Sequence, residues 1–300
     1  MKVLSLFDGI SCGMVALERT GIQVDRYAAY EIEENAIKVS KHNYPQIEQK
    51  GDVFKATYNG GEFDILIGGS PCTHWSIAKA GNKGEKGARE TTSSGIGWDL
   101  FSQYARALKE VKPKWFLYEN NESMSDDIKN EITKALGVEP IMINSVDFSA
   151  QIRKRYYWTN IPVDLDYIPS SDVFADIEYN HEYRIVDISK YKNTLKVNSD
   201  NTCWKWDASG KGYYSQQSRA RSKTIKMNTV PASGGDKNNI YLGNCTYRKL
   251  HPIEAERLQT LPDNYTSCIK SNVKRIGLCG NGWTVDVIAH IFKGLKESEE

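Results

Sequence analysis

KVLSLFDGISCG (residues 2–13) combines a short β-rich apolar run, a glycine-containing turn and the start of a helical pattern. The same order of strand, turn and helix repeats through the first 160 residues. This alternation is typical of a largely parallel sheet covered by helices on both faces, with ligands at the carboxyl ends of the strands. We therefore predict a doubly wound α/β fold. The predicted strands are residues 2–7, 26–31, 63–69, 115–119, 140–146 and 155–160, and the predicted helices are 12–20, 33–42, 98–110 and 126–136.

The composition is that of an ordinary globular protein: 300 residues carry a net charge of +1, and 40% of them are hydrophobic. These values exclude intrinsic disorder and collagen-like repeats, and no segment approaches the roughly 20 apolar residues of a spanning helix. Because Asp8 comes so early, we expect no secretory leader and an intracellular, cytoplasmic protein. The six cysteines form no CxxC pair and no zinc-like cluster with histidine, which predicts free thiols and no bound metal.

The composition changes between about residues 162 and 245, where prolines, polar glycine-rich connections and aromatic residues replace the regular alternation. Residues 200–249 contain nine lysines and arginines against three aspartates and no glutamate. A solvated basic face is one interpretation of this excess. The other is nucleic-acid contact, because cations beside tyrosine and glutamine are typical of surfaces that hold phosphates and read base edges. The candidate contacts are Arg219, Arg221, Lys223 and Lys226.

Acidic residues follow successive predicted strands. Asp8 lies in the first turn, Glu31 comes 23 residues later at the second strand end, and Asp52 lies at a third. An acid at about this spacing grips ribose hydroxyls in dinucleotide-binding folds, and glycines in the first turn let a cofactor approach helix N-terminal amides. This pattern predicts a nucleoside cofactor.

A cysteine and a glutamate also follow strands. Cys72, in the segment GGSPC, comes after a buried-looking strand, where loop amides or nearby cations can activate a thiol as a nucleophile. An isolated cysteine is also commonly inert. Glu119 and Asn120 end the next strand. A carboxylic acid beside a thiolate suggests that the thiolate attacks a heterocycle as the nucleophile while the acid donates a proton to it. Arg153 and Arg155, two positions apart, are predicted to share a face that holds phosphate or a pyrimidine carbonyl.

These blocks, in this order, resemble the DNA cytosine-C5 methyltransferases over nearly the whole chain. The matching motifs are Phe7 to Gly13, Glu31 with Asp52 and Val53, Pro71-Cys72, Glu119-Asn120, Gln151-x-Arg153-x-Arg155, residues 248–262 and residues 280–285. Residues 248–262 resemble the motif that braces the recognition domain, and residues 280–285 resemble the closing motif that folds back beside the cofactor. The style of the motifs is similar to that of the animal de novo branch and its phage and bacterial relatives.

The resemblance implies a Rossmann-like class I S-adenosylmethionine-dependent methyltransferase fold. It implies a catalytic domain at residues 1–165, a small irregular target recognition domain at 166–245, and a segment at 246–300 that completes the catalytic domain. Its implied partner is double-stranded DNA, with Cys72 attacking C6 of a flipped-out cytosine, Glu119 at N3, and Asn120, Arg153 and Arg155 holding the base and backbone. Residues 73–97, polar and glycine-rich, are either a mobile lid or a loop without function.

The resemblance also assigns binding residues. The cofactor residues that it implies are Phe7, Asp8, Gly9, Ile10, Glu31, Ile32, Asp52, Val53, Ser70, Pro71, Leu100, Asn281, Gly282 and Trp283. The DNA contacts are Ser76 and Gln151, in addition to the four basic residues above.

Two positions depart from the family's motifs: Asn121 stands where the Glu-Asn-Val block has valine, and Thr73 follows the Pro-Cys pair where glutamine or asparagine is usual. Harmless drift is one interpretation, and an altered base or methyl-donor pocket is the other. Two functional alternatives also stay open, namely tRNA cytosine methylation by the same residues and a catalytically silent DNA-binding homologue. The basic insertion favours duplex DNA, and the intact Cys72 and Glu119 favour catalysis.

Overall fold

A computed structural model describes all residues except 77–88, 200–202, 208–218, 231, 233–238 and 298–300. The chain forms two compact units. Unit 1 comprises Met1–Asn144, Lys154–Asp166 and Val287–Glu300, and unit 2 comprises Ser145–Arg153 and Tyr167–Asp286.

The centre of unit 1 is a seven-stranded sheet in the order β3-β2-β1-β4-β5-β8-β6. All neighbouring strands pair in parallel except at β8, which is antiparallel to both β5 and β6. The strands are β1 (Lys2–Leu6), β2 (Arg26–Tyr30), β3 (Glu48–Gln49), β4 (Ile65–Gly68), β5 (Trp115–Asn121), β6 (Ile141–Asn144) and β8 (Lys154–Thr159). This topology confirms the predicted Rossmann-like fold, and its central strands are apolar because both of their faces are covered.

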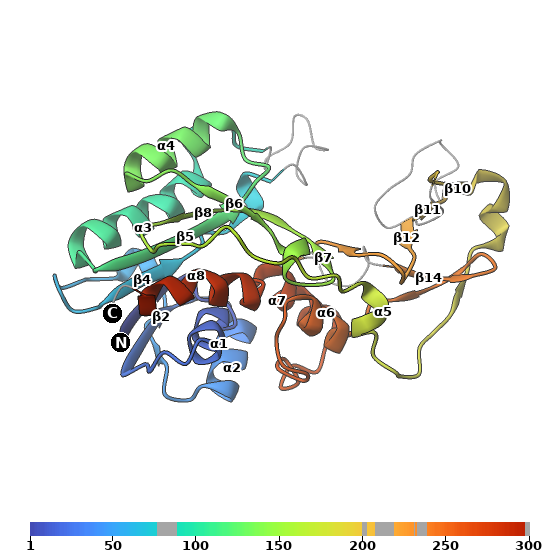
Figure 1. The fold of residues 1–300 in the computed structure, drawn as a ribbon, viewed down its shortest axis with the longest axis horizontal. Helices are drawn as coiled ribbons and strands as arrows, with labels where there is room; N and C mark the ends of the chain where they lie inside the picture. Colours follow the sequence, from blue (N-terminus) through green and yellow to red (C-terminus); the bar gives the residue numbers. More distant parts are fainter. Residues whose placement is uncertain (77–88, 200–202, 208–218, 231, 233–238, 298–300) are drawn as a thin grey trace. The chain divides into compact units, whose positions relative to one another are not determined.

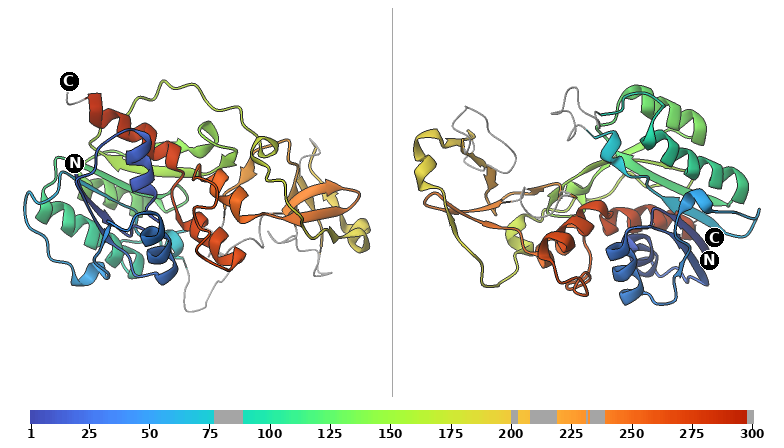
Figure 2. Two further views of the ribbon diagram at one scale, coloured as in Figure 1. Left: turned by 90° about the horizontal axis from the view of Figure 1, so that it is seen from below. Right: turned by 180° about the vertical axis from the view of Figure 1, so that it is seen from behind.

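Helices cover the two faces of this sheet, as Figures 1 and 2 show. On one face lie α3 (Ile96–Val111) and α4 (Asp126–Leu136), and on the other α1 (Cys12–Arg19), α2 (Glu34–Asn43) and α8 (Val285–Glu297). Ser125 caps the N-terminus of α4, because its side chain accepts a hydrogen bond from the Ile128 amide, and Gly137 caps the C-terminus in the left-handed conformation. Its apolar stripe of Ile128, Ile132 and Leu136 is buried, so amphipathicity and caps together define the helix.

Gly68 lets β4 pack closely inside the sheet. A Cβ at this position would lie 2.6 Å from the carbonyl oxygen of Leu6 and 3.2 Å from the ring of Tyr104. The neighbouring atoms belong to backbone and to a fully buried ring, so they cannot give way. Glycine is therefore required where β4 passes into the loop that carries Cys72.

Unit 2 contains a six-stranded sheet in the order β10-β11-β12-β14-β15-β9 and a two-stranded sheet of β13 and β7. Their strands are β7 (Gln151–Ile152), β9 (Val186–Asp187), β10 (Lys196–Val197), β11 (Cys203–Lys205), β12 (Arg219–Arg221), β13 (Met227–Asn228), β14 (Asn239–Gly243) and β15 (Thr246–Lys249). Its helices are α5 (Phe174–Ile177), α6 (Pro252–Leu258) and α7 (Asn272–Asn281). The sheets and α7 were not predicted from the sequence.

A buried ion-pair network fastens α5 to α6. Arg248 is fully buried, and its guanidinium contacts Glu254 at 2.7 Å and Glu178 at 3.0 Å. Arg257 donates to the carbonyl oxygens of Ile177 and Glu178. Breaking one partner of such a buried pair typically costs about 3–5 kcal/mol, so the segment after residue 174 is held firmly within unit 2. The bracing of a recognition domain that the resemblance implies for residues 248–262 stays a prediction.

The compact units do not coincide with the predicted functional domains. Residues up to Asp286 group with unit 2 and only Val287–Glu300 with unit 1, whereas the sequence was predicted to return to the catalytic domain near residue 246. Compactness does not test function, so the predicted division into catalytic and recognition domains stays a prediction.

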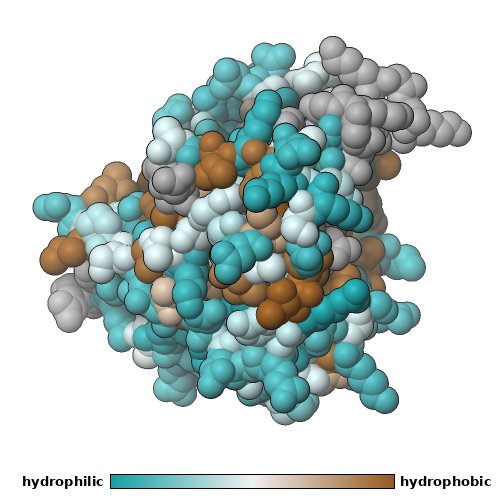
Figure 3. Space-filling view, turned by 90° about the vertical axis from the view of Figure 1, so that its right-hand side faces the viewer, coloured by the Kyte–Doolittle hydropathy of each residue, from teal (hydrophilic) through white to brown (hydrophobic). Residues whose placement is uncertain are grey.

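The described parts of the chain supply three further observations. All six cysteines are free thiols. Among the described residues, no helix is both long and apolar enough to cross a membrane, and no group of three or more histidine, cysteine or acidic side chains could hold a metal. Figure 3 shows a face of the molecule on which hydrophobic patches lie among predominantly hydrophilic side chains.

Candidate active site

Cys72 opens a short 3-10 helix, η2 (Cys72–His74), directly beyond β4 in unit 1. Its carbonyl oxygen accepts hydrogen bonds from the amides of Trp75 and Ser76, both at 3.0 Å. Trp75 is fully buried and anchors this turn, whereas Cys72 is partly exposed and Pro71 is exposed. The thiol is therefore presented at the carboxyl edge of the sheet on a fixed turn, as the sequence predicted.

Asn120 fastens the cysteine loop to β5. Its side-chain nitrogen donates to the carbonyl oxygen of Ser70 and to the hydroxyl of Tyr118, both at 3.1 Å. The hydroxyls of Ser70 and Tyr118 lie 2.7 Å apart, and burial raises the pKa of Tyr118, so its hydroxyl stays neutral. Asn120 is itself buried, and the expectation that it helps to hold the base and backbone stays a prediction. It is a positioning residue for the loop that carries Cys72.

Glu119 and Arg155 form an ion pair beside this loop. The Arg155 Nε lies 2.8 Å from a Glu119 carboxylate oxygen, and each side chain is only about a tenth exposed. Strands β5 and β8 are antiparallel here, with Asn121 opposite Arg155. Because alternate residues of a strand face the same side, Glu119, Asn121 and Arg155 share one face of the sheet. The structure thus brings Glu119 and Arg155 together in an ion pair that the sequence did not predict.

Arg153 lies between β7 and β8 and belongs to neither strand. Its buried guanidinium donates to the carbonyl oxygens of Gly280 and Gly282, at the end of α7 in unit 2. Arg153 thus satisfies helix-terminal carbonyls. Its role in holding the base and backbone stays a prediction.

Two residues that were predicted to contact DNA make their side-chain hydrogen bonds within unit 2. Gln151 is fully buried, donates to the Leu258 carbonyl at 3.0 Å and accepts from the Val230 amide at 2.7 Å. Lys226 donates to three backbone carbonyl oxygens, those of Val146, Ser149 and Ser170. These contacts give Gln151 and Lys226 a structural role within unit 2. A DNA-contacting role for either residue stays a prediction.

The turn after β1 is built for close approach of a ligand. Phe7, Gly9 and Ser11 all have positive φ, near 60°, and a Cβ on Gly9 would meet no atom within 4 Å. Asp8 accepts hydrogen bonds from the hydroxyls of Ser5, Ser11 and Tyr27, and burial raises its pKa. Asp8 therefore organises the turn, whose glycine faces open space.

Glu31 links this turn to the end of β2. One carboxylate oxygen accepts from the Gly9 amide at 2.8 Å, and the other accepts from the amides of Ile32 and Glu33. The acid predicted to hold a ribose is thus fixed beside the glycine turn. Its position is set by backbone amides and does not depend on a ligand.

Apolar side chains are exposed at the same edge. Ile32 is 71% exposed, and Phe54, on the 3-10 helix η1 (Val53–Lys55), is 53% exposed. Asp52 starts η1 by accepting a hydrogen bond from the Phe54 amide, and Val53 is buried. Exposed apolar side chains beside a fixed acid and a glycine turn fit a nucleoside, whose base is apolar on its faces and whose sugar carries hydroxyls. Phe54 was not among the cofactor residues expected from the sequence, although it follows Val53, which was.

The other predicted cofactor residues have varied positions. Ile10 and Ser70 are buried in unit 1, and Leu100 is half-buried on α3. Asn281, Gly282 and Trp283 belong to unit 2, where Asn281 ends α7. Their assignment to the cofactor stays a prediction.

The cysteine turn is also held by the chain that returns to it. The Glu90 amide donates to the His74 carbonyl at 2.9 Å, and His74 Nδ1 lies 3.3 Å from a Glu90 carboxylate oxygen. Arg89 donates to the Trp75 carbonyl. Ser76 is partly exposed, and residues 77–88 of the predicted lid lie outside the described residues. The two described ends of this segment are therefore tied together beside Cys72.

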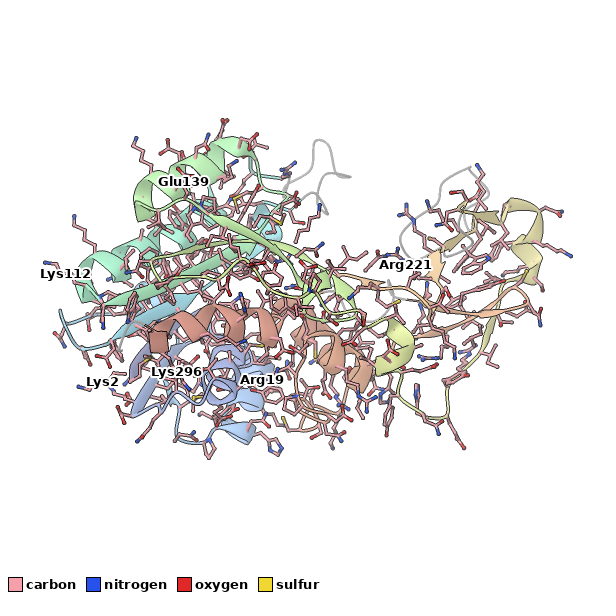
Figure 4. All side chains as sticks on the ribbon, in the orientation of Figure 1. Lys2, Arg19, Lys112, Glu139, Arg221 and Lys296 are labelled. Atoms are coloured by element: carbon pink, nitrogen blue, oxygen red, sulfur yellow. The ribbon has the colours of Figure 1, made fainter. Side chains whose placement is uncertain are left out.

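The predicted basic cluster lies partly on β12 in unit 2, which carries Arg219 and Arg221, the latter labelled in Figure 4. Arg221 donates to Asn228, and Lys223 pairs with Glu178 at 3.0 Å. In the sheet register Arg219 lies opposite Lys205, which lies opposite Lys196. Cross-strand neighbours share a face, so these cations form a row that the sequence did not reveal.

Comparison with known proteins places this geometry in context. The chain is 32% identical over 178 residues to the orphan methyltransferase M.SPRI of Bacillus phage SPR, an alignment that covers 55% of this chain but only 38% of that protein. It is 25% identical to the type II methyltransferase M.NgoPII of Neisseria gonorrhoeae, over 100% of this chain and 96% of that protein. The Schizosaccharomyces pombe (S. pombe) Dnmt2 methyltransferase structure has a TM-score of 0.70 at 15% identity, over 100% and 99% of the two chains, and so shares the fold.

The match to a family model is nearly complete. Residues 1–297 match the model of the C-5 cytosine-specific DNA methylases. The match includes the strand ends that carry Cys72, Glu119 and Glu31. The chain therefore belongs to the C-5 cytosine-specific DNA methylase family.

Proposed function

We propose that this protein is a DNA cytosine-C5 methyltransferase that acts on a flipped-out cytosine in double-stranded DNA. The observation that carries the proposal is the fastening of the Cys72 loop to β5 by Asn120, directly beside the Glu119–Arg155 ion pair. A nucleophile and an acid are thereby positioned at one sheet edge. Membership of the family supports the same reaction.

C5 of cytosine is a poor nucleophile, and Cys72 overcomes this by adding at C6. The thiolate electron pair forms the S–C6 bond, and the π electrons move toward N3, where Glu119 donates a proton or hydrogen bond. The resulting enamine makes C5 nucleophilic. After C5 is methylated, loss of its proton and elimination of the Cys72 thiolate restore the aromatic ring and the enzyme. Arg155 orients the Glu119 carboxyl group through the 2.8 Å contact.

S-adenosylmethionine, the methyl donor of this family, supplies an electrophilic methyl group when bound. Glu31 fits the ribose hydroxyls, because its carboxylate is fixed beside the Gly9 turn. Ile32 and Phe54 offer exposed apolar surface to the adenine ring. The chain's own contribution is therefore to bind and orient the donor.

Replacing Glu31 with alanine is expected to weaken S-adenosylmethionine binding by about 10- to 100-fold, because hydrogen bonds to a charged group are worth about 1.5–3 kcal/mol. Calorimetric titration of the purified full chain measures the Kd. Glu34→Ala, an exposed acid on α2, is the control and should bind the donor normally. Unchanged affinity of Glu31→Ala would show that this carboxylate does not contact the donor.

A cytosine inside a duplex cannot reach Cys72, so it must be flipped out at a cost of a few kcal/mol. Protein contacts with the DNA must offset this cost. We assign such contacts to residues 166–245, with Arg219, Arg221 and Lys223 as candidates together with Lys196 and Lys205. We further propose that the protein acts inside the cell, in the setting of bacterial or phage DNA modification.

The direct test incubates the purified full chain with methyl-labelled S-adenosylmethionine and, in separate reactions, duplex DNA, single-stranded DNA or tRNA. Label recovered as 5-methylcytosine, preferentially in duplex DNA, is the expected result. Preferential labelling of tRNA would replace DNA with RNA as the substrate. Binding to DNA without any label would identify a silent homologue. Sequencing of methylated DNA from expressing cells would then identify the target site.

A further inference from the structure

Asn121, the last residue of β5, carries a buried carboxamide without hydrogen-bond partners. Its side chain is 4% exposed, and neither its Oδ1 nor its Nδ2 has a partner among the described residues. Only its backbone is engaged there, through donation of its amide to the Asn120 side chain at 2.8 Å. Buried polar groups in folded proteins nearly always have a partner, so this carboxamide requires one that the chain does not supply.

The position of Asn121 indicates where that partner lies. Along β5, Glu119 and Asn121 face one side of the sheet, and Asn120 faces the other, toward Ser70. Arg155, the cross-strand neighbour of Asn121, makes the ion pair with Glu119. The unsatisfied carboxamide therefore lies next to the pair that is proposed to act on the cytosine ring.

A valine would fill a buried strand position without unsatisfied polar atoms, and the family motif that the sequence resembles has valine here. Asparagine is the more costly choice for stability unless a ligand satisfies it. The polar partner must arrive with the substrate, because the neighbouring Glu119 and Arg155 already bond to each other. The edge of cytosine next to N3 carries a 4-amino group, a hydrogen-bond donor that suits the carboxamide oxygen.

We propose that Asn121 is a specificity-determining residue whose Oδ1 accepts a hydrogen bond from the 4-amino group of the flipped cytosine. This inference rests on the proposed function, since it requires the base beside Glu119. Glu119 serves N3, and Asn121 serves the neighbouring exocyclic nitrogen. The two side chains together read the edge that distinguishes cytosine from a pyrimidine without the amino group.

The test compares two trapped bases in the target site of a duplex: 5-fluorocytosine, which has the 4-amino group, and 5-fluoropyrimidin-2-one, which lacks it. Covalent adduct formation is timed for the wild-type chain, Asn121→Val and Asn121→Thr. Valine and threonine have the same shape, but only threonine keeps an acceptor. Melting curves of the three proteins show whether each is folded.

The wild-type chain is expected to form the adduct faster with 5-fluorocytosine than with 5-fluoropyrimidin-2-one. The ratio of these two rates should be about 10-fold smaller for Asn121→Val. Asn121→Thr should retain more of it than Asn121→Val. Equal preference in all three proteins would overturn the inference while leaving the proposed function intact. Failure of the wild-type chain to form an adduct with 5-fluorocytosine would overturn the proposed function and this inference with it. If Asn121→Val does not fold, Asn121→Ala replaces it as the variant without an acceptor. Equal preferences for 5-fluorocytosine in Asn121→Thr and Asn121→Ala would then overturn the inference.

Discussion

Cys72→Ala is expected to lower methyl transfer to DNA by at least about 10⁴-fold, because without a group that adds at C6 the C5 carbon has no route to nucleophilic reactivity. The side chain is partly exposed on η2 and its turn is fixed by backbone hydrogen bonds, so the substitution should leave the fold intact. Donor binding should be unchanged, since the Gly9 turn and Glu31 do not depend on the thiol. Single-turnover transfer of labelled methyl groups and calorimetric titration measure the two properties.

A matched thiol supplies the control for this experiment. Cys268 is also a partly exposed cysteine that forms no disulfide, and it belongs to none of the proposed binding surfaces. Cys268→Ala should therefore keep the turnover of the unchanged protein within about twofold. Turnover of Cys72→Ala above a tenth of the unchanged rate would rule out Cys72 as the nucleophile.

Glu119→Gln is expected to reduce kcat by about 10²- to 10⁴-fold, the range that a positioned general acid contributes. The amide keeps the shape of the side chain but cannot donate a carboxyl proton to N3, and it leaves the Arg155 guanidinium without its anionic partner. Loss of that partner should also lower the melting temperature, because the pair is largely buried. Rapid-quench kinetics and thermal unfolding measure these effects separately.

Glu139, an exposed acid labelled in Figure 4, is the control for the Glu119 substitution. Glu139→Gln should change neither rate nor stability beyond about 0.5 kcal/mol. A Glu119→Gln protein that is folded and retains the unchanged kcat would mean that the reaction needs no acid at this position.

The fold could be predicted because local signals and tertiary structure agree in unit 1. Strands such as β1 and β4 are short runs of apolar residues buried on both faces, and α4 shows caps and an amphipathic stripe. Strand ends also placed Cys72, Glu119 and Glu31 at one edge, because parallel strands present their carboxyl ends together. This part of the site follows from the sheet topology, because the strand–turn–helix pattern that specifies the topology recurs along the sequence.

The sequence did not reveal the contacts that polar side chains make inside the protein. Arg153 lies between β7 and β8, and its guanidinium contacts carbonyl oxygens about 130 residues later in the chain. Gln151 and Lys226 bond to backbone groups distant in sequence, and no local pattern reports such partners. The same limit concealed the contact of Asn120 with Ser70, which lies 50 residues earlier in the cysteine loop.

Unit 2 was predicted only as an irregular region because its strands are short. Most have two or three residues, too few to show a period, and their pairing joins segments far apart in the chain. Helix α7 contains Gly277 and Gly280, which lower intrinsic helix propensity, yet its Ile276 and Leu278 are buried. Tertiary packing therefore decides these elements, and local sequence does not.

The most direct test of the account is the chemical identity of the atom that attacks the base. A duplex carrying 5-fluorocytosine at the target site is incubated with the full chain and S-adenosylmethionine, and the trapped complex is digested and mapped by mass spectrometry. The expected result is a single nucleotide-bearing peptide with the methylated base joined to the sulfur of Cys72. An adduct on any other cysteine, or turnover of the labelled DNA without an adduct, would contradict it.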